Sequence, residues 1–323
     1  MSVGSFAPSV GPSGRVFAQS AGPDMLLFAG PRVPVRKPLQ VPGESGEALC
    51  ADAPGIAGRE GRYGRGDSMR TVAIAMQKGG SGKTTTTVNL AATLAERGQK
   101  VLVVDVDPQA NATSWLGVRD AGKGIFTCLC ENTSIDSIVQ KTMTPGVEVV
   151  PSSTWLVGAE KALASEVGAE TLLRRKLRPL RQAYDVTLID TPPTLGVLTI
   201  GALAAADEVL VPVEAHVMAL NGLAQLLHTV ETVRERLNDD LVLGGIVACR
   251  VDARTRHSLE IVEELRKRFP SDVFTTVVRE NVRIAEAPSF GQPITTYEPK
   301  SAGAEDYRAL AGEILTRWQA NGR

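Results

Sequence analysis

The stretch of the chain that most restricts its fold is AMQKGGSGKTTTTVNL, residues 75–90. The apolar run at residues 71–76 is typical of a buried parallel strand, and a helix is expected over residues 83–97. A strand, a glycine-rich turn and a helix in this order form a phosphate-binding loop, because glycines let backbone N–H groups turn toward phosphate oxygens. The sequence of this loop departs from the usual phosphate-loop pattern. No glycine stands at the first position of the standard pattern, and an extra lysine, Lys78, comes next.

The loop carries groups that suit a nucleoside triphosphate. Lys83 is expected to reach the β- and γ-phosphates, and the hydroxyl of Thr84 is a ligand for Mg²⁺. The helix that begins near Lys83 adds the positive end of its dipole. We therefore predict an ATP-binding site formed by Lys78, Gly79, Gly80, Ser81, Gly82, Lys83, Thr84 and Thr85.

Two acids at strand ends are predicted to complete the site. Asp190 ends the apolar run VTLID and is the expected second magnesium ligand, either directly or through water. Asp107 lies in DVDPQAN, where Pro108 forces a turn that aims the carboxylate over the phosphates. Asp105 is expected to be structural. Acids at strand ends can be mere turn residues, but two of them framing a phosphate loop favour a catalytic role.

Strands alternate with helices along the rest of the chain. This order predicts an α/β fold with a mostly parallel sheet that helices cover on both faces, and ligands bind such sheets at the carboxyl ends of the strands. Further strands are expected at residues 100–107, 147–152, 184–190, 207–215, 241–250 and 272–278, and further helices at residues 171–182, 220–237, 258–269 and 302–319.

Composition sets the remaining limits. Residues 1–68 are rich in Gly, Pro, Ser and Ala and predict a disordered tail, either natural or the product of a mis-called start, so residues 69–323 are the expected domain.

The formal net charge is −1, so DNA binding would need a local basic patch or an oligomer. Four scattered cysteines favour a reducing cytosol, and Cys128 and Cys130 are expected to be small buried residues rather than metal ligands. No apolar run approaches the ~20 residues of a membrane span.

Five motifs together resemble the ParA/Soj family of DNA-partitioning ATPases, part of the deviant-Walker-A P-loop group that includes MinD. They are KGGSGKTTT, VLVVDVDPQANAT, YDVTLIDTPPTLG, VRIAEAPSFGQPI and GAEDYRALAGEI, in the family's order from residue 69 to about 315. The resemblance implies a P-loop NTPase fold, Mg²⁺-dependent ATP hydrolysis and an ATP-dependent homodimer. Lys78 matches the signature lysine that crosses to the partner's nucleotide, and such a cation neutralises charge on the γ-phosphate. Lys78, Lys83 and Asp107 are the implied catalytic residues, with Asp107 in switch I and residues 190–193 in switch II.

The resemblance also implies binding of non-specific DNA through Arg254 and Arg283, stimulation by a ParB-type centromere-binding protein, and a cytoplasmic, nucleoid-associated location. The cargo is a chromosome or a plasmid. Two segments depart from the family: VRENVR stands where many relatives have IPRNVR, so Glu280 replaces an arginine and Arg279 a proline, and AHVMALNG stands where many have EYYALEG.

Other functions within the wider group remain open. A ParA-like ATPase that positions other protein cargo would share every motif. A MinD-like membrane-cycling ATPase needs a basic amphipathic C-terminal helix, and the last segment has few basic residues. An iron–sulfur carrier needs cysteine ligands that DTPPTLG does not offer.

Overall fold

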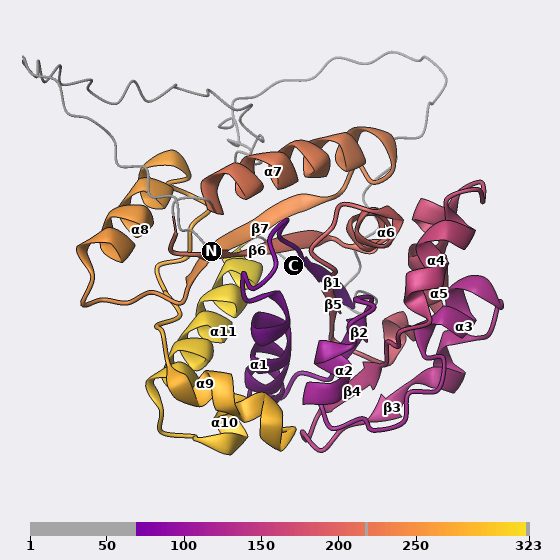
Figure 1. Ribbon diagram of the computed structural model, residues 1–323, viewed down its shortest axis with the longest axis horizontal. Coiled ribbons are helices and arrows are strands. Elements are labelled where there is room, and N and C mark those ends of the chain that lie inside the picture. The colour runs from indigo at the N-terminus through magenta and orange to yellow at the C-terminus, as the bar shows by residue number, and fades with distance from the viewer. Residues whose placement is uncertain (1–68, 217–218, 321–323) are drawn as a thin grey trace, which may run out of the picture. The chain divides into compact units, whose positions relative to one another are not determined.

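The structure, a computed structural model, describes residues 69–216 and 219–320 (Figure 1). The predictions made for the tail and for Cys50 lie outside these residues. The described chain contains a seven-stranded sheet with the order β3-β4-β2-β5-β1-β6-β7, in which all neighbours are parallel except β3 and β4. The strands are β1 Arg70–Ile74, β2 Val101–Asp105, β3 Gln140–Lys141, β4 Val147–Val150, β5 Val186–Asp190, β6 Glu208–Glu214 and β7 Val242–Cys249.

Helices cover both faces of this sheet, as predicted. Helices α1 (Lys83–Glu96) and α11 (Ala302–Ala320) lie on one face, and α6 (Val197–Ala205) and α7 (Ala219–Arg236) lie on the other (Figure 1). The remaining helices are α2 Asn111–Trp115, α3 Ile125–Cys130, α4 Leu156–Leu163, α5 Leu172–Leu177, α8 Arg256–Arg268, α9 Val282–Glu286 and α10 Ile294–Tyr297.

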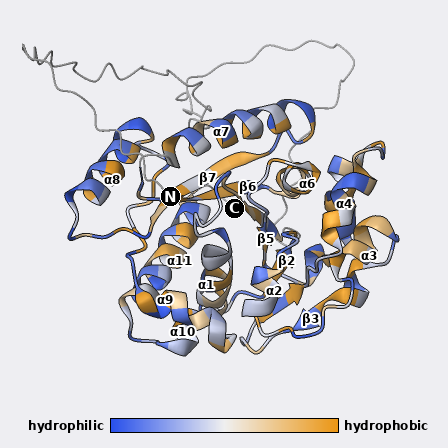
Figure 2. Cartoon of the chain, in the orientation of Figure 1, coloured by the Kyte–Doolittle hydropathy of each residue, from blue (hydrophilic) through white to orange (hydrophobic). Residues whose placement is uncertain are grey.

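The alternation of side chains along β1 explains the two apolar cores. Val72 and Ile74 belong to the core under α1 and α11, whereas Ala73 belongs to the core under α6 and α7. Because successive side chains of a strand point to opposite faces, a strand covered on both sides must be apolar throughout. Figure 2 shows this as hydrophobic strands inside hydrophilic outer helix faces.

Two expected elements differ from the structure. The strand predicted over residues 272–278 is wrong: the segment makes one isolated bridge, from Val273 to Ile246, and a second bridge, from Arg279 to Val251, follows directly after it. The single helix predicted over residues 171–182 is divided into a 3₁₀ turn, α5 and a second 3₁₀ stretch that begins at residue 178. Pro179 explains the second break, because proline lacks an N–H and its ring hinders a continuous helix.

A bulge in β7 brings a loop residue close to the sheet. Val209 pairs with Leu243, but the next residue of β6, Leu210, pairs with Gly245, so one extra residue is inserted in β7. A Cβ atom on Gly245 would lie 2.4 Å from Cε2 of Phe274. Glycine is therefore required here for the ring to pack against the strand.

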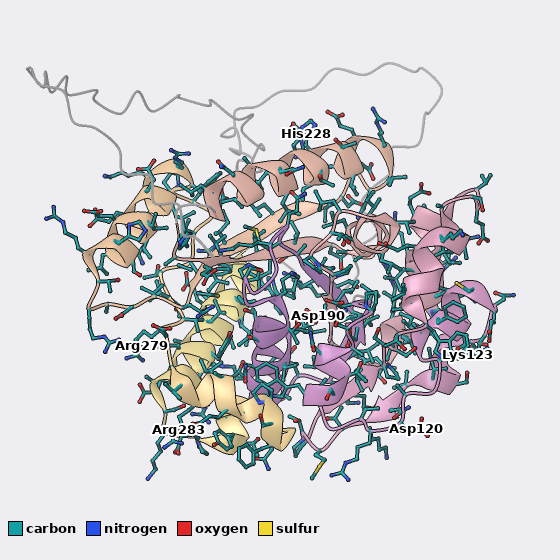
Figure 3. The ribbon with its side chains drawn as sticks, in the orientation of Figure 1. Asp120, Lys123, Asp190, His228, Arg279 and Arg283 are labelled. Carbon is teal, nitrogen blue, oxygen red and sulfur yellow. The ribbon has the colours of Figure 1, made fainter. Side chains whose placement is uncertain are left out.

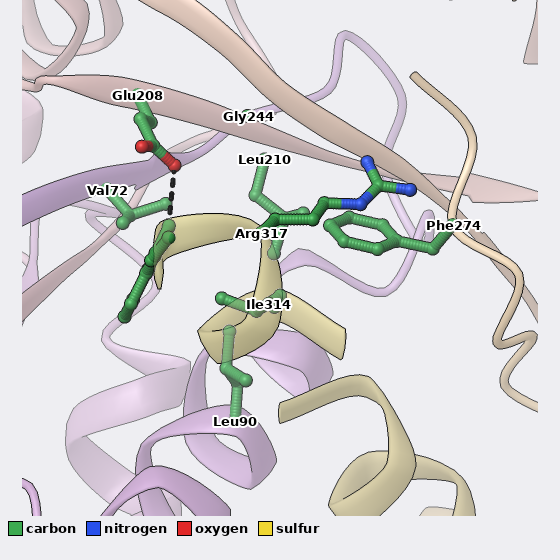
Figure 4. A pocket seen from close by; sticks show the side chains of 9 residues that line it. Val72, Leu90, Glu208, Leu210, Gly244, Phe274, Ile314 and Arg317 are labelled. Atoms are coloured by element: carbon green, nitrogen blue, oxygen red, sulfur yellow. Dashed lines mark hydrogen bonds between the residues drawn. The ribbon is translucent and has the colours of Figure 1, made fainter. Parts of the chain in front are cut away.

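The C-terminal helix is anchored by a buried carboxylate at the amino end of β6. Glu208 accepts a hydrogen bond from the indole Nε1 of Trp318 at 2.9 Å and from Nη1 of Arg70 at 2.8 Å. The Arg70 guanidinium also lies 4.5 Å from the Trp318 ring centroid. Figure 4 shows the small cavity that Glu208, the first residue of β6, lines beneath α11. Among the described residues, no helix is long and apolar enough to cross a membrane.

Candidate functional site

The glycine-rich loop joins the carboxyl end of β1 to α1, as predicted. Gly80 and Gly82 have φ of 74° and 92°, which only glycine adopts at little cost. Helix α1 has no acid in its first turn and no side-chain cap, so its first N–H groups face the loop. The hydroxyl of Ser81 is buried and has no hydrogen-bond partner among the described residues. A phosphate oxygen would satisfy these donors.

A cleft of about 1230 Å³ opens above the loop. It is large enough for a nucleotide, since ligand pockets typically measure about 300–1,000 Å³. Its walls include residues 79–85, Asp107, Arg250, Arg254, Glu280 and Asn281.

Lys83 is the buried cation of the cleft. The whole residue is only 6% exposed, and its Nζ donates a hydrogen bond to the carbonyl oxygen of Lys78 at 3.2 Å. Burial lowers the pKa of Lys83, and the charges of Asp190 and Asp107 act in the opposite direction. Lys83 thus faces the two acids that the sequence placed at neighbouring strand ends.

Asp190 lies at the carboxyl end of β5, next to β1 (Figure 3). Its Oδ2 accepts a hydrogen bond from Thr84 at 2.8 Å and its Oδ1 from Thr87 at 3.0 Å. Full burial, followed by the charge of Asp105, raises the pKa of Asp190 to about 8. A buried carboxylate beside a threonine hydroxyl is a donor set of hard oxygens, which fits Mg²⁺. Thr87 was not identified from the sequence.

Asp105 acts as a structural acid, in agreement with its predicted role. It accepts hydrogen bonds from the backbone N–H of Asp107 at 3.0 Å, and from the N–H and hydroxyl of Thr113 at 2.9 and 2.7 Å. These bonds fix the start and the end of the segment that carries Asp107. Burial raises the pKa of Asp105 to about 6.

Asp107 lines the cleft and is held in place by Ser152 and Gln109. Its carbonyl oxygen accepts a hydrogen bond from Ser152 at 2.6 Å, and its Oδ1 accepts one from the N–H of Gln109 at 2.9 Å. Its second carboxylate oxygen makes no hydrogen bond that the described residues supply, which leaves it available to a ligand or water. The structure therefore brings Asp107, Asp190 and Lys83 to one edge of the sheet.

The extra lysine of the loop forms an ion pair with a residue that was not predicted to belong to the site. Lys78 Nζ lies 2.7 Å from Oε2 of Glu214, the last residue of β6, and Oε1 of Glu214 lies 3.0 Å from Nη1 of Arg250. A carboxylate at the end of a strand next to β1 was the available signal. The strand order needed to use it could not be seen in the sequence.

The two predicted DNA-binding arginines lie on the surface, Arg254 at the wall of the cleft and Arg283 outside it. Arg254 makes two bonds to Asp252, at 2.9 and 3.0 Å, and Arg283 on α9 bonds Glu286 at 2.8 Å. Their side chains are 86% and 54% exposed, so solvent weakens both pairs. Figure 3 shows Arg283 at the periphery, far from Asp190.

The departures from the family pattern have different surroundings. Arg279 is bound by Asp306 of α11, with Nη2 to Oδ1 at 2.6 Å, and is therefore a structural residue. Glu280 is half-exposed, lines the cleft and lies 3.9 Å from Arg250.

Among the described residues, no group of three or more His, Cys, Asp and Glu side chains could hold a metal. Cys128 is fully buried, as predicted, whereas Cys130 is only partly buried.

Known proteins match most of the described chain. Residues 69–243 match the family model described as an AAA domain. The sporulation initiation inhibitor protein Soj of Bacillus subtilis is 45% identical over 247 residues, which is 76% of this chain and 98% of Soj. The chromosome partitioning protein ParA of Myxococcus xanthus is 45% identical over 262 residues, 79% of this chain and 93% of that protein.

A solved structure agrees with the fold. A Mycobacterium smegmatis protein described as cobyrinic acid a,c-diamide synthase, with bound ADP and magnesium, superposes with a TM-score of 0.70 and is 33% identical. The match covers 79% of this chain and 97% of that one. With the sheet order, the glycine-rich loop and these relatives in agreement, the chain belongs to the ParA/Soj family of chromosome-partitioning P-loop ATPases.

Proposed function

We propose that the chain is a Mg²⁺-dependent ATPase that dimerises with ATP, binds DNA without sequence preference and partitions a chromosome or plasmid. The observation that carries the proposal is the meeting of Lys83, Thr84, Asp107 and Asp190 at one edge of the sheet, beside a cleft of nucleotide size. Residues 69–323 would act as the ATPase domain, in the cytoplasm and on the nucleoid.

In this proposal the loop holds the nucleotide. Backbone N–H groups of residues 79–85, the Ser81 hydroxyl and the Lys83 ammonium bind the phosphates, and Thr84 and Asp190 hold Mg²⁺, Asp190 directly or through water. The metal would neutralise charge on the β- and γ-phosphates. Relatives solved with ADP or an ATP analogue and magnesium support this assignment.

Asp107 and Lys78 are proposed to make hydrolysis depend on dimerisation. Asp107 orients the attacking water, because its carboxylate lies in the cleft next to Lys83. Lys78 supplies a cation to the nucleotide of the partner subunit. Lys78→Ala should therefore impair hydrolysis far more than ATP binding by the monomer, measured by turnover and calorimetry. Normal hydrolysis by this variant would refute the assigned role.

DNA binding is proposed to use Arg254 and Arg283 in the dimer. A two-fold dimer presents each arginine twice, so one substitution removes two phosphate contacts. The slope of log affinity against log salt should then fall by about two for each arginine replaced. Sequence should not matter, because phosphate contacts carry no base information. A ParB-type partner is proposed to stimulate hydrolysis and thereby release the DNA.

DNA retention with ATP, ADP or no nucleotide tests this part of the proposal. We expect retention with ATP only, and its loss in Arg254→Ala/Arg283→Ala with dimerisation intact. The matched control is Arg174→Ala/Arg175→Ala on α5, which removes two exposed arginines that have no acid within 4.0 Å among the described residues. Equal retention with ADP and ATP, or loss only in the α5 variant, would contradict the assignment.

The C-terminal helix does not suit a membrane-cycling ATPase. Within the described part of α11, Arg308 is paired with Glu96 and Arg317 with Glu313, and the apolar side of the helix is buried against the sheet. A free basic face and an exposed apolar face, which surface binding to a bilayer needs, are thus both missing from these residues.

A further inference from the structure

Three charged side chains from three segments meet beside the nucleotide cleft, which one of them, Arg250, lines. Lys78 comes from the loop, Glu214 from the end of β6 and Arg250 from the end of β7, and we call them the Lys78–Glu214–Arg250 triad. Glu214 sits between the cations, with Oε2 at 2.7 Å from Lys78 and Oε1 at 3.0 Å from Arg250. Each oxygen of the carboxylate thus has its own cation.

We propose that Glu214 holds Lys78 on its own subunit until the ATP dimer forms, and that Arg250 neutralises Glu214 once Lys78 has left. This inference rests on the proposed function, because it requires Lys78 to reach the partner's nucleotide. Glu214 is thus a positioning residue, which sets how readily the lysine crosses.

The contact with Glu214 competes directly with the crossing. Lys78 has one ammonium group on a flexible stem, and an ammonium held 2.7 Å from its own subunit's carboxylate must leave it to extend across an interface. The lysine and glutamate side chains are only 31% and 21% exposed, so this ion pair is screened less than a fully exposed one. Part of the binding free energy of the dimer is therefore spent on breaking it.

Arg250 lowers that cost in the same geometry. Without it, the departure of Lys78 would leave the partly buried Glu214 carboxylate without either of the two cations that flank it, which is unfavourable. Arg250 also draws on the same carboxylate and so weakens its hold on Lys78. Its backbone has φ of 52°, a left-handed conformation that non-glycine residues rarely adopt, so the surrounding structure must hold it there.

The triad therefore predicts effects of opposite sign. Glu214→Gln frees Lys78 and should favour the dimer, whereas Arg250→Gln removes the arginine that shares Glu214 with Lys78 and should disfavour it. A partly exposed, charge-assisted hydrogen bond corresponds to roughly a fivefold effect for each lysine released. Since two lysines must leave for every dimer, the dimer dissociation constant should change by about 25-fold.

The test is the dimer dissociation constant of the full chain, measured by sedimentation velocity with magnesium and a non-hydrolysable ATP analogue. We expect it to fall about 25-fold in Glu214→Gln, to rise severalfold in Arg250→Gln, and to be insensitive to Arg250→Gln in the Glu214→Gln background. Replacing Lys78 by alanine should abolish the effect of Glu214→Gln. Glu264→Gln, which removes a surface ion pair of 2.6 Å on α8, is the matched control.

Each outcome decides the inference. Affinity for ADP, measured by calorimetry, and the thermal midpoint show whether a variant still folds and binds nucleotide as a monomer. If both substitutions weaken the dimer, or if Arg250→Gln acts equally with and without Glu214, the triad has only a structural role and the inference is overturned. A wild-type chain that stays monomeric with the analogue overturns the proposed function as well. A wild type that dimerises but is unaffected by Glu214→Gln overturns the inference alone.

Discussion

The buried carboxyl group of Asp190 should make the stability of the metal-free protein depend on pH. Desolvation, followed by the charge of Asp105, raises the pKa of Asp190 from 3.8 to about 8. Between these values the folded chain retains a proton that the unfolded chain has released. The stability contributed by this proton is complete below the unfolded pKa and is lost as the pH rises through the folded pKa.

The size of the effect follows from one retained proton. The free energy of unfolding should fall by about 1.4 kcal/mol for each pH unit over which the folded state holds it. From pH 6 to pH 8 the loss is about 2 kcal/mol, because deprotonation of the folded state begins near the upper limit. Asp105, with a pKa raised to about 6, titrates mainly below this window.

Asp190→Asn removes the titrating group, so its unfolding free energy should not show this fall. Relative to the wild type, the variant should become about 2 kcal/mol more stable as the pH rises from 6 to 8. Urea unfolding at pH 6, 7 and 8, in a chelator and without nucleotide, measures the difference. Asp239→Asn, which removes an exposed carboxylate, is the control. Parallel wild-type and Asp190→Asn curves across this range would show that the folded chain holds no such proton.

Three other substitutions test the site and the fold. Lys83→Ala should abolish nucleotide binding, because the phosphates lose their buried cation, and unchanged affinity in calorimetry would contradict the site. Asp107→Ala should keep Mg-ATP but stop hydrolysis, which gives an ATP-locked dimer in gel filtration; a monomer with ATP, or wild-type turnover, would reject that role. Trp318→Phe should cost about 2 kcal/mol of unfolding free energy, because the buried Glu208 carboxylate loses a hydrogen bond. Its ATP affinity should stay unchanged, and a loss below about 0.5 kcal/mol would show that the indole N–H is dispensable.

The strands and the phosphate loop could be predicted because their signals are local. Buried parallel strands are continuous apolar runs, and glycines beside Lys83 mark the turn within a few residues. The segment 272–278 contains three valines and a phenylalanine, yet it does not form a strand. Its Phe274 packs where Gly245 leaves room, and that depends on a bulge in β7, which no local pattern announces.

The charged contacts of the site could not be predicted for a similar reason. Glu214 meets Lys78 although 136 positions separate them, and they meet only because β6 lies directly beside β1. The sequence likewise did not indicate that Arg279, which precedes α9, would be bound by Asp306 in the first turns of α11. Acids at strand ends could be recognised as a class, whereas their individual partners follow from the strand order.

The two margins of the sheet bear on how copies of this chain can associate. On one margin, β3 is only two residues long and antiparallel, and on the other the segment after α8 covers β7 through its two bridges. An uncovered strand offers a row of free N–H and C=O groups to any neighbouring copy, which leads to open-ended growth. Short and covered margins remove that template. In the dimer proposed above, copies would pair through the loops above the strands rather than strand to strand, so their association would stay limited and reversible.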